Sequence, residues 1–476
     1  MLENEDKYIT LQTGEVNDNN ILEALLAKTP FSFSHIKIIV LLLLFLIGDG
    51  MLMISSSLII PIIATPLNLS KFEVSFISGS LFLGYTIGAF ISGIISDNIG
   101  RKSTFIIGNL IMIIGGLVPV LLHIDKNIIM SCNLIIGISL GISIPCIFSL
   151  VAEVMSKDCR SIFVGMGWVV FPLGEIFLCI FSQKLHMWNY KNGNWKIILY
   201  VRLVLFFVTL FMSFFIVESP KFLLHKNPNI NNDKAFSIIE ELTNIELTQE
   251  QKENIIHSYI NDNPKNSKGI LHSFISLFSK NHFLKSLNLF VLWFISSYVF
   301  YGLIYVLPAA YQQINMVKKK ATTLNQESYN EIMSNVIISC IFEIPSNILV
   351  GILPNIKIIG RKGSINLGFG LSLIFSLIAW LSPKTLTVAA SFLKGTISLG
   401  FNVLYIYTPE HYPVYMRVTS LGMCNFFSRI GGMVTPLINE ILLRKSYLLN
   451  FLGFSIASFI ATFLSAILPS DSLEEK

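Results

Sequence analysis

The sequence predicts an all-α membrane protein with twelve transmembrane helices arranged as two halves of six. Its 476 residues are 53% hydrophobic and only 13% charged, whereas soluble domains carry about 25% charged residues. The apolar residues fall in long runs, and a spanning helix needs about 20 such residues. A pattern of charges between the runs occurs once in each half of the chain. Because charges are costly near hydrocarbon, their repetition indicates a duplicated architecture.

Twelve apolar runs are long enough to span a bilayer, and polar turns separate them. They are roughly 36–63, 72–95, 104–122, 128–151, 162–185, 197–217, 286–311, 331–353, 363–381, 385–408, 418–441 and 446–468. We therefore expect five segments, namely a polar cytoplasmic tail, a first half, a central cytoplasmic loop, a second half and a C-terminal tail. Their bounds are 1–35, 36–217, 218–285, 286–468 and 469–476. An even number of spans places both tails on one side of the membrane.

The central loop contains two segments with the pattern of amphipathic helices. One runs near Asp233–Leu242, and the other begins at Thr248. Gln251 follows Thr248 by three residues, which is the spacing of a capping box. We expect both helices to lie outside the bilayer and to divide the chain into its two halves.

The repeated charges lie at the ends of corresponding runs in the two halves. They are Arg101, Glu153 and Arg160 in the first half and Arg361, Glu410 and Arg417 in the second. The interval from Glu to Arg is seven residues in both. A single exposed ion pair contributes only about 0–1 kcal/mol, so such charges would act as a network that breaks and re-forms. We expect the three charges of each half to form one cluster, and the two clusters to pair across the halves when the cavity is closed on that side, which would gate one face. Ordinary loop charge without a gating role is the alternative.

Charged residues inside the apolar runs point to function, because a bilayer disfavours them. The first half contributes Asp49 and Glu175, and the second contributes Glu343, Lys394 and Arg429. We hypothesise that Arg429 attracts an anionic part of a substrate, while Asp49 or Glu175 takes a proton or a cationic part. The equal alternative is that Lys394 and Arg429 only neutralise Glu343 or Asp49.

Two aromatic residues in the seventh run, Trp293 and Tyr301, are further candidates for a binding site. Aromatic faces stack on flat or cationic molecules. For each residue alone, packing or anchoring at the membrane interface is the alternative.

Several motifs identify a resemblance. Gly93-Ile-Ile-Ser-Asp97-Asn-Ile-Gly100-Arg101-Lys102 resembles the signature between spans 2 and 3 of the major facilitator superfamily, and it stands at that place. Glu218-Ser219-Pro220 resembles the motif that ends span 6 in sugar porters and organic ion transporters. The second half resembles the organic cation/anion and synaptic-vesicle-related branch. That likeness rests on Trp293-Phe294, Tyr301-Gly302-Leu303, Glu343-Ile344-Pro345 and Tyr407-Thr408-Pro409-Glu410-His411-Tyr412-Pro413.

The resemblance implies a transporter that moves a small organic solute by alternating access of its two halves, with no enzymatic activity and no cofactor. It also implies cytoplasmic gating by Asp97, Arg101, Glu153, Arg160, Glu218, Arg361, Glu410 and Arg417. Two departures stand out. Lys357 replaces the Asp expected in the second copy of the loop motif, and Asn133 stands where relatives carry an arginine implicated in proton coupling. Uniport, symport and exchange therefore all remain open.

Other classes are less consistent with the sequence. The Gln-Leu-Ser motif of sugar porters is absent from the seventh run, so a hexose porter ranks second. A sensor or scaffold of the same fold that does not transport is the alternative from another class. All eight histidines lie in loops or at boundaries, which disfavours metal or haem ligation within the bilayer. No phosphate-binding Gly-Lys-Ser/Thr motif indicates an ATP-driven pump.

We expect the partners to be the lipid bilayer and a small-molecule substrate. The basic residues are scattered rather than clustered, which argues against nucleic acid. The chain is expected to be a monomer with both termini in the cytoplasm, in the plasma membrane or an organelle membrane.

Overall fold

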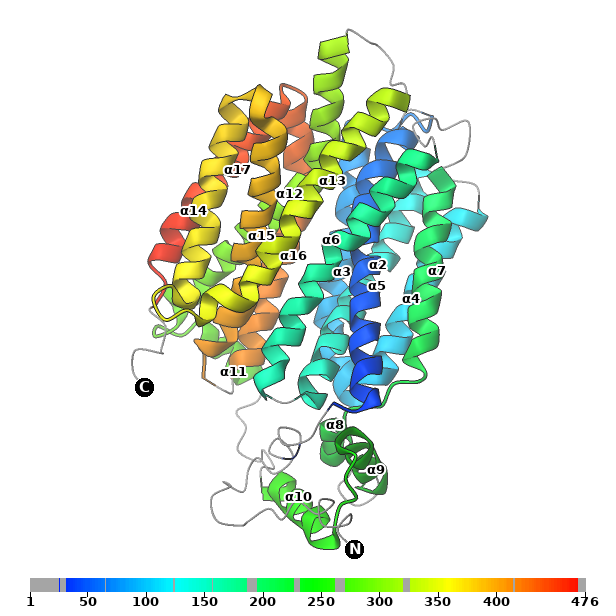
Figure 1. The fold of residues 1–476 in the computed structure, drawn as a ribbon, viewed down its shortest axis with the longest axis vertical. Helices are drawn as coiled ribbons and strands as arrows, with labels where there is room; N and C mark the ends of the chain where they lie inside the picture. The colour runs from blue at the N-terminus through cyan, green and yellow to red at the C-terminus, as the bar shows by residue number, and fades with distance from the viewer. Residues whose placement is uncertain are drawn as a thin grey trace, which may run out of the picture.

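A computed structural model describes residues 25, 31–64, 66–122, 125–155, 157–185, 195–226, 232–261, 270–319, 326–413 and 416–469. Almost all of them are helical, and the predicted fold class of twelve helices in two six-helix halves is confirmed. Figure 1 shows the two halves standing side by side, with their helices roughly parallel to one long axis.

Each half consists of six long helices. The first half contains α2 (Phe33–Ala64), α3 (Lys71–Ile99), α4 (Arg101–Leu121), α5 (Lys126–Val154), α6 (Lys157–Lys184) and α7 (Trp195–Ser213). The second contains α12 (Phe283–Lys319), α13 (Gln326–Ile352), α14 (Gly360–Leu381), α15 (Leu386–Glu410), α16 (Arg417–Leu443) and α17 (Tyr447–Ala466). Within the described residues, ten helices are long and apolar enough to cross a membrane. Helices α6 and α16 complete the bundle by their positions in it.

Four helices form most of the interface between the halves. Helix α3 packs against α16, and α6 packs against α13. The intramembrane charges singled out above lie on α2, α6, α13, α15 and α16, so most of them belong to these interface helices or to their neighbours. The fold therefore brings charges from distant parts of the sequence toward the centre of the bundle.

A small helical unit lies beyond one end of the bundle (Figure 1). It comprises α8 (Pro220–Lys226), α9 (Asn232–Thr243) and α10 (Gln249–Asn261), and α11 (Ile270–Leu277) then leads into α12. Helices α9 and α10 occupy the positions predicted for amphipathic helices. The predicted capping box is present, since the Thr248 N–H donates to Gln251 Oε1 at 3.0 Å and the Gln251 N–H donates to Thr248 Oγ1 at 3.3 Å. We call this end of the molecule the α8–α10 end.

Candidate substrate-binding and gating sites

Five charged side chains from both halves lie buried near the middle of their helices. They are Asp49, Glu175, Glu343, Lys394 and Arg429, and none is more than 3% exposed. Burial of charge is unfavourable unless each group finds a partner. The contacts of these side chains therefore define the chemistry at the centre of the bundle, which we call the central layer.

Lys394 joins the two halves within the central layer. Its ammonium group pairs with the carboxylate of Glu175 on α6 and lies 3.1 Å from Glu343 Oε2 on α13. Cys340, one turn before Glu343, has its Sγ 3.2 Å from Lys394 Nζ and 3.2 Å from Glu175 Oε2. Glu175 belongs to the first half and the other three to the second. A single cation thus serves a carboxylate on each side of the interface.

Close helix packing sets the position of the first-half acids. Gly50 follows Asp49 on α2, and Gly174 precedes Glu175 on α6. A Cβ on Gly50 would collide with the carbonyl oxygen of Phe171, and one on Gly174 would collide with that of Ile47. Only hydrogen in place of a side chain lets the two backbones approach this closely. The glycine beside each acid therefore holds α2 against α6 and brings both carboxylates to the same level.

Arg429 on α16 is held by aromatic side chains. Its Nη1 donates to the hydroxyl of Tyr301 at 2.9 Å, and its guanidinium carbon lies 3.5 Å from the ring centroid of Tyr85 on α3. Tyr301 in turn contacts Phe82 of α3, with ring centroids 4.7 Å apart. A cation over an aromatic face is stabilised by the ring quadrupole. Arg429 therefore also spans the interface between halves, through aromatic partners rather than through an ion pair.

Asp49 is the least satisfied acid of the central layer. Among the described residues, its buried Oδ1 has no hydrogen-bond partner. The charges that act on it are those of Arg429 and Glu175. Three carboxylates thus share the layer with two cations, so the layer carries one excess negative charge when every group is ionised. Buried carboxylates with an excess negative charge favour binding of a proton or of another cation.

The contacts of these charges bear on both interpretations of them. Lys394 does pair with Glu343, as the neutralisation alternative holds, and it pairs with Glu175 as well. Arg429 instead bonds Tyr301. The indole Nε1 of Trp293 donates to Thr408 Oγ1 at 3.0 Å, and its ring packs on Tyr405 with centroids 4.4 Å apart. Trp293 is thus a fully buried packing residue of the second half in this conformation.

The first charge cluster lies at the α8–α10 end, at the junction of α3 and α4. Arg101 Nε pairs with Glu153 Oε1 at 3.0 Å, and its Nη2 lies 3.2 Å from Asp97 Oδ1. Glu218 accepts from the backbone N–H groups of Arg101 and Lys102 at 2.9 and 3.1 Å. It therefore caps the first turn of α4, where unpaired N–H groups favour an anion.

The second cluster repeats this arrangement in part. Arg361 Nε pairs with Glu410 Oε2 at 2.5 Å. Arg417 is exposed, and its Nε donates to the carbonyl of Tyr412 at 3.2 Å. The side chain of Arg160 lies outside the described residues. The ion pairs described here, Arg101 with Glu153 and Arg361 with Glu410, each join two residues of the same half. Pairing between the two clusters across the halves stays a prediction.

Hydrogen bonds between the two halves are described at several levels of the bundle. Ser75 Oγ on α3 donates to the carbonyl of Pro436 on α16 at 3.3 Å. Gln183 Nε2 on α6 donates to the carbonyl of Asn330 on α13 at 2.9 Å. Nearer the α8–α10 end, Asn347 Nδ2 donates to the carbonyl of Trp168 at 2.7 Å. The two halves are therefore hydrogen-bonded to each other away from the charge clusters.

The sequence analysis did not single out three buried residues that the structure brings to notice. Tyr85 and Cys340 gave no signal of their own, because an aromatic or a cysteine in an apolar run is ordinary. Arg202 did give one, since it is a lone arginine inside the sixth apolar run. Asn133 donates its amide to the carbonyl of Ile77 at 3.0 Å and lines the same small cavity as Arg202.

Comparison with known proteins agrees with this architecture. The profile of the family described as "Sugar (and other) transporter" matches residues 62–324. The chain is 24% identical to the synaptic vesicle 2-related protein of Pongo abelii, over 96% of this chain and 82% of that protein. It is 26% identical to solute carrier family 22 member 15 of Xenopus tropicalis, over 84% and 70%. It is also 26% identical to organic cation/carnitine transporter 7 of Arabidopsis thaliana, over 82% of each.

Solved structures share the fold at lower identity. The partially occluded, inward-open conformation of the xylose transporter XylE from E. coli superposes with a TM-score of 0.68 at 13% identity, over 91% of this chain and 97% of that one. The proton:xylose symporter XylE bound to 6-bromo-6-deoxy-D-glucose gives 0.67 at 14% identity, over 91% and 96%. These likenesses show the fold, and the chemistry of this chain must be read from its own residues.

Proposed function

The chain belongs to the sugar (and other) transporter family of the major facilitator superfamily, and on that premise we propose that it carries a small organic ion coupled to, or in exchange for, a proton. It is an integral, multi-pass membrane protein of a family of small-solute transporters, and not an enzyme. The proposal concerns the charge of the solute, the coupling ion and the residues that bind them.

The observation that carries the proposal is the excess negative charge of the central layer. Among the described residues, the cations that act on Asp49, Glu175 and Glu343 are Lys394 and Arg429, and all five side chains are buried. An uncompensated charge in a medium of low dielectric constant attracts a counter-charge strongly. A proton or the cationic group of a solute supplies that counter-charge. An uncharged hexose does not, and this favours an organic ion over a sugar.

The way Lys394 bridges the halves gives a physical basis for alternating access. Glu343 and Lys394 belong to the same half and move together, while Glu175 belongs to the other half. Separating the halves at this level exposes Glu175 without its partner. A proton or a cationic solute then takes the place of Lys394 at Glu175, and closure of the halves restores the ion pair. Ion binding is thus linked to the conformational change.

Aromatic side chains provide a place for the rest of the solute. Tyr85 and Tyr301 surround Arg429, and Phe82 lies against Tyr301 from the facing half. Their faces suit a flat or cationic organic group. An anionic group of a zwitterionic solute would compete with the Tyr301 hydroxyl for the Arg429 guanidinium, which makes Arg429 the proposed anion-binding residue.

The gating residues and the orientation form a further part of the proposal. We assign the α8–α10 end to the cytoplasm, with both termini on that side and the protein acting as a monomer. Arg101 and Arg361 with their acidic partners Glu153 and Glu410 then lie on the cytoplasmic face. The repeated Arg–Glu ion pair, one in each half at the same end of the bundle, supports a role of these residues in gating that face. The other proposed gating residues, Asp97, Arg160, Glu218 and Arg417, belong to the same two clusters.

Uptake into proteoliposomes tests the proposal. The purified chain is reconstituted and offered labelled organic cations, zwitterions, organic anions and hexoses, with and without a pH gradient. We expect saturable uptake of a cation or zwitterion that depends on the gradient. Glu175→Gln should reduce this uptake at least tenfold, while Glu440→Gln, a carboxylate outside the central layer that pairs with Arg444, should leave it unchanged.

Two outcomes would contradict the proposal. Saturable hexose uptake that is insensitive to Glu175→Gln would favour the hexose porter instead. Binding of a solute without any accumulation, in vesicles that retain their gradient, would favour a sensor of the same fold.

A further inference from the structure

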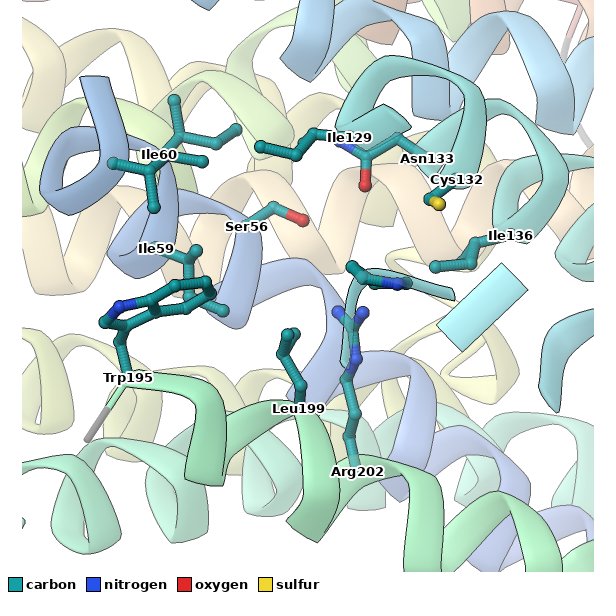
Figure 2. Close-up of a pocket in the computed structure, with 12 residues that line it drawn as sticks. Ser56, Ile59, Ile60, Ile129, Cys132, Asn133, Ile136, Trp195, Leu199 and Arg202 are labelled. Atoms are coloured by element: carbon teal, nitrogen blue, oxygen red, sulfur yellow. The ribbon is translucent and has the colours of Figure 1, made fainter. Parts of the chain in front are cut away.

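A small cavity lies inside the first half, away from the interface between the halves. Its volume is about 40 Å³, and its walls come from α2, α4, α5 and α7 (Figure 2). None of its lining residues belongs to the second half. It lies toward the end opposite α8–α10, since Trp195, the first residue of α7, is part of its wall. The cavity is therefore separate from the central layer.

Arg202 directs its guanidinium into this cavity, as Figure 2 shows. The residue is only 6% exposed. Its Nη1 donates to the hydroxyl of Ser55 at 3.0 Å. A guanidinium has five N–H donors and accepts nothing, so one bond to a neutral hydroxyl leaves most of its capacity unused. The cavity wall beside it carries the polar side chains of Ser56, Cys132 and Asn133.

No acidic partner of Arg202 is found in the part of the chain that the structure describes. Within the described residues, no Asp or Glu oxygen lies within 4.0 Å of its guanidinium nitrogens, and the titratable group that acts on it is the Cys132 thiol. The adjoining stretches 123–124 and 186–194 contain no Asp or Glu in their sequence. Arginine stays charged in proteins, so it cannot relieve this burial by losing its proton.

We propose that Arg202 and the cavity it faces form a binding site for a small inorganic anion of the size of chloride. A buried, unpaired charge is strongly destabilising, and an anion that accepts from the guanidinium removes that penalty. The Cys132 thiol offers a further donor at the wall. The Ser56 hydroxyl donates to the Leu52 carbonyl at 3.3 Å, and it would add a second donor by turning toward the anion. The anion is a resident of the first half, distinct from the solute proposed for the central layer.

The size of the cavity favours a halide over a lipid phosphate. A water-sized body needs about 10–15 Å³ of such volume, so the cavity holds roughly three of them. One chloride with a water or two fits this space. A phosphodiester with its two ester arms does not, although its charge would suit Arg202 equally well. The two sources of negative charge can therefore be told apart by experiment.

Direct binding of radioactive chloride to the full-length protein tests the site. The chain is purified in detergent with gluconate as the buffer anion, and ³⁶Cl⁻ binding is measured by equilibrium dialysis. We expect one saturable site per chain, with bromide competing for it. Arg202→Met should abolish the site. Arg444→Met, which removes an arginine that is half exposed near the end of α16, should retain it.

Thermal unfolding provides a second readout that does not depend on transport. A ligand that binds only the folded chain raises the melting temperature, by about 2–5 °C at concentrations far above its Kd. We expect this rise for the wild type when chloride replaces gluconate at constant ionic strength. Arg202→Met should melt higher than the wild type in gluconate, because the unpaired charge is gone, and should gain nothing from chloride.

Several results would overturn the inference. Absence of saturable chloride binding to the wild type would mean that water alone solvates Arg202. Equal binding by Arg202→Met would place the anion elsewhere. A phospholipid that co-purifies with the wild type but not with Arg202→Met, and that chloride does not displace, would identify a lipid phosphate as the occupant. The wild-type measurements decide the question even if the variant fails to fold.

Discussion

Replacing Glu175 with Gln should shift the balance between conformations, whereas replacing Glu343 with Gln should not. Both carboxylates contact Lys394 in the central layer. Glu175, however, reaches Lys394 across the interface between the halves, while Glu343 lies in the same half as Lys394. If the halves move as rigid bodies, only the contact with Glu175 breaks during alternating access.

The size of the shift follows from the contact that is lost. A hydrogen bond to a charged group contributes about 1.5–3 kcal/mol. Because Lys394 keeps Glu343 as a partner, Glu175→Gln leaves no uncompensated charge that would add to this figure. With every 1.4 kcal/mol equal to a factor of ten, the population of conformations with separated halves should rise roughly 10- to 150-fold. Glu343→Gln loses a comparable contact in every conformation, so it should lower thermal stability without changing the populations.

Distances between two spin labels, one in each half, measured by electron paramagnetic resonance, can detect this difference between the two variants. One spin label replaces Asn98 at the end of α3, and the other replaces Ile358 before α14, which is 96% exposed. The five described cysteines are buried, which favours labelling at the introduced sites. A redistribution of distances in Glu175→Gln that is absent from the wild type and from Glu343→Gln is the expected result. Equal redistribution in both variants would refute the assignment of Glu175 as the moving contact.

Three further variants extend the reasoning. Glu218→Ala should destabilise the fold by about 1–2 kcal/mol in thermal unfolding, because the backbone N–H of Arg101 loses its hydrogen-bond acceptor. Glu218→Gln keeps an acceptor, so an equal loss of stability in both variants would argue against capping by Glu218. Arg429→Lys should raise KM for uptake at least tenfold, since lysine cannot keep both the hydrogen bond to Tyr301 and the stacking on Tyr85. Unchanged uptake by a folded Arg429→Ala variant would show that Arg429 does not bind the substrate. Asp49→Asn should make uptake independent of the pH gradient while leaving exchange intact, and gradient-driven accumulation by this variant would exclude Asp49 as the proton carrier.

The helices themselves were largely predictable from the sequence, and the differences at their ends have physical causes. The seventh run was predicted as 286–311, but α12 continues to Lys319 because a helix need not end where its apolar residues do. The sixth run was predicted to reach residue 217, yet α7 ends at Ser213. Beyond Ser213 the backbone carbonyls of Phe214 and Ile216 accept from the ammonium group of Lys102 instead, at 2.9 and 2.7 Å.

The gating charges show a different limit. Their repeated spacing located both clusters at the same end of the bundle. Spacing gives the position of a residue along its own helix, but it does not give the helix on which its partner lies. The sequence grouped Arg101 with Glu153, and only the structure showed that the two form a direct ion pair between α4 and α5.

The sequence by itself determined the class of this protein, because the penalty for charge in hydrocarbon and the length of a spanning helix are local properties. It also marked Asp49, Glu175, Lys394 and Arg429 as unusual. Only the tertiary structure decided that Lys394 joins a carboxylate from each half and that Arg202 faces a cavity with Ser55 as its hydrogen-bond partner. Pairing depends on how closely and at what rotation the helices pack, and that is a property of contacts far apart in the chain.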